Sequence, residues 1–142
     1  MERALALAAQ AAAHGEVPVG AVIVQGGKII TEAANAMRAT CDPTAHAEIV
    51  ALRRAAAALS SQFLADCDLY VTLEPCAMCA GAIAQARIAR LYFAAEDPKG
   101  GAVVHGARVF AHPTCHHKPE IYGGIGASIA SAQLKDFFAE RR

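Results

Sequence analysis

The sequence predicts an α/β fold in which a mixed sheet is covered by helices on both faces. Strand-like and helical patterns alternate along the chain, and the first two strand-like segments flank a hairpin turn, Gln25-Gly26-Gly27-Lys28. A hairpin followed by strand–helix alternation gives a sheet with both antiparallel and parallel neighbours. The 142 residues contain neither a repeat nor a low-complexity linker, so a single domain over residues 1–142 is expected.

The first half of the chain is expected to form two helices around this hairpin. Residues 2–13 suit a helix, 17–24 a strand with Pro18 near its start, and 29–34 the returning strand. The sequence Asp42-Pro43-Thr44 offers side chains that cap helix N-termini, which predicts a helix over 45–59. Its core face should consist of residues at steps of three and four: Ile49, Leu52, Ala56 and Leu59.

The second half continues with alternating strands and helices. A short apolar strand is expected over 67–73, in which Cys67 is a core thiol, then a helix over 76–86 and a strand over 88–95. Proline and glycine interrupt 98–124, which favours functional or interface loops with short ordered pieces. A last helix is expected over 128–142. Its adjacent Phe137 and Phe138 cannot share a face, so one should be buried and the other exposed.

Composition excludes several classes of protein. A hydrophobic fraction of 55% with 18% charged residues excludes a disordered chain. Thirteen basic residues balance thirteen acidic ones, so a nucleic acid would have to meet a local patch. No apolar run reaches the roughly 18 residues of a membrane span, and the first helix lacks the basic start of a secretory signal. Five cysteines, an odd number, cannot all pair within the chain. We therefore expect a cytoplasmic protein without a membrane partner.

Three residues at expected helix starts form a candidate zinc site: His46, Cys76 and Cys79. The two cysteines are three positions apart, so they share one face of a helix, whose N-terminus favours the thiolate form. Three protein ligands leave the fourth tetrahedral position for water, as in catalytic rather than structural zinc sites. A Cys-x-x-Cys motif alone also fits a redox pair. Its combination with His46 predicts one Zn2+ per chain.

Glu48 is the candidate proton carrier. Side chains at positions i and i+2 of a helix point in different directions, so Glu48 cannot easily ligate the metal that His46 binds. From the first turn of the helix it can still lean over the cavity beside the metal. There it can take a proton from water and return it to a ring nitrogen and then to leaving ammonia.

These motifs, His46-Ala47-Glu48 and Pro75-Cys76-Ala77-Met78-Cys79, resemble those of the cytidine/deoxycytidylate deaminase superfamily. Within it, the family of bacterial tRNA-specific adenosine deaminases resembles essentially the whole chain, most clearly at 16–21, 42–49, 72–83, 97–102 and 136–142. The resemblance implies a three-layer α/β/α sandwich with a five-stranded mixed sheet and a homodimer. It also implies hydrolytic conversion of adenosine to inosine at the wobble position of a tRNA anticodon.

The resemblance also implies binding roles by position. Asn35 would hydrogen-bond the target nucleoside, and Val17, Ala47 and Pro75 would line its pocket. Because the net charge of the chain is zero, binding of the tRNA anticodon stem-loop must depend on a local arrangement of side chains. The residues implied near the stem-loop are Asp97, Lys99, Phe138 and Arg141, and the further cations available are Lys118, Lys135 and Arg142.

Several alternatives stay open at this point. A small-molecule guanine or cytosine deaminase would have the same zinc apparatus, and zero net charge favours it, whereas residues 97–101 and the Phe-Phe-x-x-Arg-Arg ending argue against it. A non-catalytic zinc-binding subunit could dispense with Glu48. The segment Cys115-His116-His117 offers a second metal site, or loop histidines that contact phosphate or the dimer partner. At His116 this segment departs from the family pattern.

Overall fold

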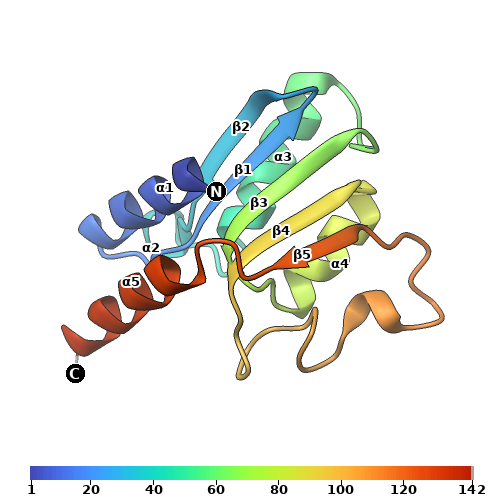
Figure 1. The fold of residues 1–142 in the computed structure, drawn as a ribbon. Coiled ribbons are helices and arrows are strands. Elements are labelled where there is room, and N and C mark those ends of the chain that lie inside the picture. Colours follow the sequence, from blue (N-terminus) through green and yellow to red (C-terminus); the bar gives the residue numbers. More distant parts are fainter. Residues whose placement is uncertain (142) are drawn as a thin grey trace.

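The computed structural model describes residues 1–141, which form a five-stranded mixed sheet between two pairs of helices (Figure 1). Helices α1 (Glu2–Ala13) and α5 (Ala127–Ala139) cover one face, and α3 (Ala47–Leu59) and α4 (Ala77–Ala86) cover the other. The expected three-layer fold is therefore confirmed. None of the helices within the described residues has the length and apolar character needed to cross a membrane.

The strands lie in the order β2-β1-β3-β4-β5. Strand β1 is antiparallel to both of its neighbours, whereas β3, β4 and β5 are mutually parallel. Because β2 and β3 both run opposite to β1, they run in the same direction and end at the same edge of the sheet. The strand bounds are Gly20–Gln25 for β1, Lys28–Ala34 for β2, Cys67–Leu73 for β3, Arg90–Ala95 for β4 and Glu120–Gly123 for β5.

The sequence did not predict β5, which lies inside the stretch expected to form loops with short ordered pieces. All of its residues are exposed, so the alternation of buried and exposed side chains that marks a strand is missing. Parallel neighbours cannot be joined by a tight turn, so the chain between β4 and β5 must cross over the sheet. This crossover, residues 96–119, contains one short helix, η1 (Val109–Ala111).

Several predicted boundaries differ in the structure. Strand β1 starts at Gly20 rather than Val17, because Pro18 has no N–H group for the sheet. Asp42 does not cap α3. Its Oδ1 instead accepts hydrogen bonds from the backbone N–H (2.9 Å) and hydroxyl (2.7 Å) of Thr44, which closes a local turn. The short helix α2 (Met37–Thr40) was not predicted. The last helix ends at Ala139 and residues 140–141 form a turn, so the predicted helix over 128–142 was too long, and Arg142 itself lies outside the described residues.

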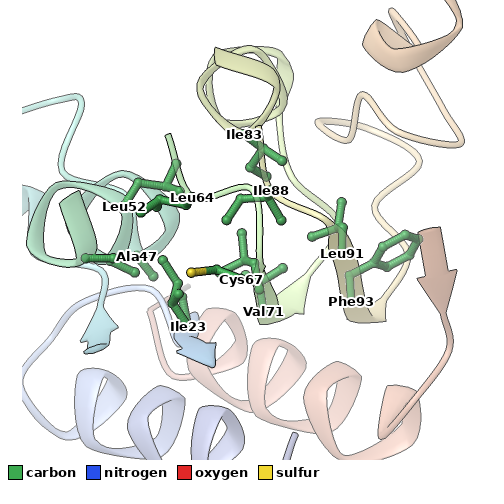
Figure 2. Packing of buried hydrophobic residues seen from close by; sticks show 14 of the residues in the cluster. Ile23, Ala47, Leu52, Leu64, Cys67, Val71, Ile83, Ile88, Leu91 and Phe93 are labelled. Carbon is green, nitrogen blue, oxygen red and sulfur yellow. The ribbon is translucent and has the colours of Figure 1, made fainter. Parts of the chain in front are cut away.

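The main core lies between the sheet and the pair α3 and α4 (Figure 2). The face of α3 that is fully buried consists of alanines, Ala47, Ala51 and Ala55, which let the helix backbone approach its neighbours closely. Of the predicted core face, Ile49 and Leu52 are buried and Leu59 is half-buried but packs against the core, whereas Ala56 is half-buried and lies outside the core cluster. Cys67 is buried as predicted, and this burial, with nearby aspartates, raises the pKa of its thiol to about 11.

On the opposite face, α1 and α5 pack on the sheet and on each other. Gly20 permits the close approach of α1 to β1, because a Cβ at this position would overlap the carbonyl oxygen of Ala4. At the end of α5, Phe137 is buried and Phe138 is 49% exposed, which confirms that only one of the two phenylalanines belongs to the core.

Candidate active site

The predicted zinc ligands converge at the edge of the sheet where β2 and β3 end. Helix α3 follows β2, and α4 follows β3 directly, so both helices begin at this edge and contact each other. His46 and Cys76 occupy the N-cap positions of the two helices, and Cys79 lies in the first turn of α4. The topology of the sheet therefore brings together residues that are thirty positions apart.

The three side chains have the spacing that a tetrahedral ion requires. His46 Nδ1 lies 3.7 Å from Cys76 Sγ and 3.5 Å from Cys79 Sγ, and all ligand atoms lie within 4.8 Å of one another. Zn–S and Zn–N bonds of about 2.3 and 2.05 Å at a tetrahedral angle give an N···S separation of about 3.6 Å. The donor set of two thiols and one imidazole thus fits Zn2+, and the zinc-binding triad expected from the sequence is present.

The ionisation of the two cysteines favours metal binding. The pKa of Cys76 is lowered to about 5 by the adjacent Cys79 thiol, by backbone N–H groups at the start of α4 and by His46. The pKa of Cys79 is raised, first because its thiol serves as the donor to Cys76 and then because it is buried. One thiolate is thus already available, and a cation can displace the proton that the pair retains.

Glu48 lies in the first turn of α3, is 4% exposed and is not one of the three clustered ligands. Burial raises the pKa of its carboxyl group above the usual range. It lies close enough to Cys79, Cys76 and His46 for each of them to influence the pKa of its carboxyl group. A buried carboxyl group with a raised pKa, close to a metal site, is suited to moving protons.

Asn35 has a role in the fold that the sequence did not reveal. Its side-chain Oδ1 accepts a hydrogen bond of 2.8 Å from the backbone N–H of Ala47, the first residue of α3. This bond satisfies one of the N–H groups that a helix start leaves without an internal partner. It thereby fixes the segment that carries His46 and Glu48.

The remaining predicted site residues lie in two different layers of the fold. Ala47 and Pro75 are buried, and Val17 is half-buried against the main core. Asp97 and Lys99 lie in the crossover, where Asp97 Oδ1 accepts a hydrogen bond of 3.2 Å from the backbone N–H of Lys99. Phe138 and Arg141 lie at the end of α5, on the opposite face of the sheet from α3 and α4.

Arg141 is folded back on its own helix. Its guanidinium carbon lies 3.5 Å from the centre of the Phe137 ring, and its Nη1 donates a hydrogen bond of 3.1 Å to the Phe137 carbonyl oxygen. Its side chain keeps 37% of its surface exposed. The exposed ring of Phe138 and this guanidinium therefore form a small surface at the end of α5.

Glu74 is a buried carboxylate that sequence analysis did not identify as functional. Its side chain is fully buried at the end of β3, two residues before Cys76. Burial alone would favour the neutral form, but hydrogen bonds from backbone N–H groups of the crossover and from the His105 ring lower the pKa of Glu74. No sequence signal near Glu74 reveals these partners, which lie at least 23 positions away.

Two histidines of the crossover, His112 and His117, lie within hydrogen-bond distance of backbone carbonyl oxygens. His117 Nε2 lies 2.7 Å from the carbonyl oxygen of Ile88, and His112 Nε2 lies 2.7 Å from that of Ala107. The Cys115 thiol donates to the His117 carbonyl oxygen at 3.2 Å. Within residues 1–141, His46, Cys76 and Cys79 form the single cluster of potential ligands, so the alternative of a second metal site at 115–117 finds no support.

Comparison with known proteins shows similarity to deaminases over the whole chain. The profile of the MafB19-like deaminase family matches residues 1–142. The chain is 52% identical to the tRNA-specific adenosine deaminase of Agrobacterium fabrum over 142 residues, which cover all of this chain and 93% of that protein.

Two solved structures have related folds. One, from a study of A-to-I editing by tRNA:A34 deaminases at the wobble position of transfer RNA, has a TM-score of 0.93 and 52% identity. The matched region covers 94% of this chain and 97% of the chain in that structure. The guanine deaminase of Bacillus subtilis has a TM-score of 0.68 and 37% identity, with 85% and 80% covered.

The donor set predicts that the purified protein contains one zinc ion per chain. Replacing either cysteine, Cys76→Ala or Cys79→Ala, should remove most of the zinc and lower thermal stability, because metal binding and folding are coupled. Elemental analysis of protein purified without chelators measures the zinc content, and thermal unfolding measures the stability. Cys41→Ala removes an exposed cysteine outside the site and should keep the full zinc content. Full zinc retention in both ligand variants would contradict the assignment.

Proposed function

Since this chain belongs to the tRNA-specific adenosine deaminases of the MafB19-like deaminase family, we propose that it converts adenosine to inosine at the wobble position of a tRNA anticodon. The chain is a zinc-dependent hydrolase with the His46, Cys76 and Cys79 ligand set of such enzymes. The observation that carries the proposal is 52% identity, over nearly the full length of both chains, to proteins that act on tRNA. A tRNA substrate also supports the expected cytoplasmic location.

A free base is the second candidate substrate. The likeness to a guanine deaminase at 37% identity and the zero net charge favour it. The identity and the TM-score are both lower for that protein than for the structure of the tRNA deaminase group. These differences favour the tRNA substrate, and the two substrates can be separated by direct assay.

Glu48 carries the proton in the proposed reaction. When zinc is bound by the ligand triad, it supplies a Lewis acid that lowers the pKa of a water molecule. The Glu48 carboxylate accepts a proton from the attacking water and delivers it to the adenine ring nitrogen. Glu48 then takes the remaining proton of the added oxygen and delivers it to the amino group, so that the C–N bond breaks, ammonia leaves and the carbonyl group of inosine forms. Its burial beside the ligand cluster keeps the carboxyl group away from bulk solvent during these transfers.

The adenosine is held by residues around the starts of the two helices. The Asn35 amide nitrogen can donate to the nucleoside while its oxygen remains bonded to Ala47. Val17, Ala47 and Pro75 form the apolar walls around the base. A base in a single-stranded loop can enter such a site at little unstacking cost, which makes an anticodon loop a suitable substrate.

The rest of the anticodon stem-loop is gripped by residues outside this pocket. Lys99 is exposed on the crossover next to Asp97, and the end of α5 presents Phe138 and Arg141. Phosphate contacts by the cations supply affinity, and the exposed aromatic ring offers a stacking surface. The cations Lys118 and Lys135 are also exposed, whereas Arg142 lies outside the described residues.

The role of Glu48 predicts a variant that binds zinc but does not turn over. Glu48→Ala should keep the zinc and the fold, because Glu48 is not a ligand. Its rate of deamination should fall by roughly four orders of magnitude, the upper end for a general acid–base group. Single-turnover assays on a stem-loop and elemental analysis test this. Activity within about tenfold of the parent would exclude this role.

The substrate assignment predicts that Phe138→Ala weakens stem-loop deamination by roughly 5- to 100-fold, the usual effect of losing one base–aromatic stack. Point substitution is preferable to removing 137–142, because Phe137 is buried. Zinc content should not change, and binding should weaken steeply with added salt. Ile129→Ala, which also removes an exposed apolar side chain from α5, is the control. Rapid ammonia release from guanine or cytosine, with no inosine in the stem-loop, would instead establish the free-base reaction.

We also propose that two chains associate through a groove between α3, α4 and the crossover. The groove has a volume of about 1020 Å³ and is lined largely by apolar side chains. Its lining includes residues of α3 that the sequence assigned to the core (Ile49, Leu52 and Ala56), together with residues of α4. The apolar lining comprises Ile49, Leu52, Ala56, Phe63, Gly81, Ala82, Ala84, Ala86, Val109 and Cys115.

A dimer predicts a concentration-dependent mass and a disruptive substitution in this groove. The parent should sediment as a symmetric dimer at micromolar concentration. Ala82→Arg should give a monomer, because it places a charge beside Arg53 and Arg87, which also line the groove. Ala58→Arg is the control, since Ala58 is exposed on α3 outside the groove. A parent that sediments only as a monomer would contradict the proposal.

A further inference from the structure

The Glu74 carboxylate is fully buried, and its partners are hydrogen-bond donors of one segment, residues 97–105. Its Oε1 accepts from the backbone N–H of Asp97 at 3.0 Å and lies 2.8 Å from the His105 ring nitrogen. Its Oε2 accepts from the backbone N–H groups of Val103 (3.1 Å), Val104 (3.0 Å) and His105 (3.1 Å). Five donors thus converge on the two oxygens, whose lone pairs are occupied.

The backbone of 97–105 is shaped around this carboxylate. Gly101 lies so close to Glu74 that a Cβ there would approach within 2.5 Å of Glu74 Oε2 and of the Asp97 carbonyl oxygen. The Gly101 N–H donates to that same carbonyl oxygen at 2.8 Å, which closes a tight turn over 97–101. The segment therefore wraps the carboxylate and cannot move from it without breaking several bonds together.

The same segment is tied to the zinc site and to a proposed RNA contact. Glu74 is followed at once by Pro75 and then by the ligand Cys76, and the Ala102 N–H donates to the Pro75 carbonyl oxygen at 2.8 Å. At the other end, Asp97 Oδ1 accepts from the backbone N–H groups of Lys99 (3.2 Å) and Gly100 (3.0 Å). A chain of hydrogen bonds thus runs from the start of α4 to the backbone of Lys99.

We infer that Glu74 is a positioning residue for RNA binding. It holds the 97–105 segment at a fixed place relative to the zinc ligands, so that the segment can bind the stem-loop while the target base lies at the zinc site. This inference rests on the proposed function of the site. Glu74 does not act on the reacting atoms, because its oxygens are committed to the crossover. Its contribution is to orient Asp97 and Lys99 before the substrate arrives, which reduces the ordering cost of binding.

The test is Glu74→Gln, which keeps the shape of the side chain. An amide group turns one oxygen into a donor, and in either orientation that donor faces at least one backbone N–H of the segment. Two buried donors that face each other without an acceptor are destabilising, so the substitution should loosen the 97–105 segment. The expected result is a KM for an anticodon stem-loop raised by roughly tenfold or more, with zinc content unchanged and kcat nearly retained at saturating RNA.

Amide hydrogen exchange gives a readout that needs no RNA. In Glu74→Gln the amides of Val103, Val104 and His105 should exchange at least roughly tenfold faster, while those of α4 keep their protection. Gly101→Ala disturbs the same contact from the other side and should reproduce the pattern if the first variant folds poorly. Glu120→Gln makes the same chemical change at an exposed position on β5 and should leave every measurement unchanged.

The outcomes separate this inference from the proposed function. If the parent does not deaminate a stem-loop at all, the proposed function fails. If the parent is active, an unchanged KM in Glu74→Gln overturns the inference, whether or not exchange is faster. Loss of zinc, or a large fall in kcat without a change in KM, also overturns it, because Glu74 would then support only the metal site.

Discussion

The common starting edge of α3 and α4 is the constraint on which the rest of the site depends. A tetrahedral cation accepts ligand atoms only within a few ångströms of one another, and here three such atoms lie within 4.8 Å. Strands β2 and β3 both run antiparallel to β1, so their ends meet at one edge, and each is followed by one of the two helices. The pairing of β1 with its two neighbours therefore determines whether a metal site can exist.

Helix starts and buried negative charge are matched at this edge. Each start presents backbone N–H groups without partners inside the helix, and these favour anions or side-chain acceptors. Asn35 supplies an acceptor to α3, and the N–H groups at the start of α4 help to lower the pKa of Cys76. In the crossover, likewise, backbone N–H groups donate hydrogen bonds to a buried acceptor, the Glu74 carboxylate. The site is thus held by bonds between side chains and backbone, a rigid arrangement suited to acid–base chemistry.

The crossover between β4 and β5 connects the two surfaces to which we assign binding. A parallel strand pair requires such a connection, and here it passes first beside the zinc site and then along α3 and α4. Its first part, 97–105, is fixed by Glu74, and its second part, 109–117, forms one wall of the groove. A single segment therefore lies next to both the proposed RNA contact and the proposed subunit contact. Binding at either surface would restrict the same stretch of backbone.

The sequence alone determined the zinc ligands and most of the secondary structure, because these depend on local spacing, and it singled out Glu48 as the acidic residue beside the ligands. A Cys-x-x-Cys pair places its thiols on one face of a helix wherever that helix lies, and the short apolar segment 67–73 predicted β3 over its full length. Only the tertiary structure decided the role of Glu74, whose partners lie 23 to 31 positions away, and the existence of β5, whose exposed residues have no alternating pattern. It also decided that Ala51 and Ala55, rather than Ala56 and Leu59, form the fully buried face of α3. In each case the deciding contacts join segments that are distant along the chain, and local sequence carries no information about which distant segment will be adjacent.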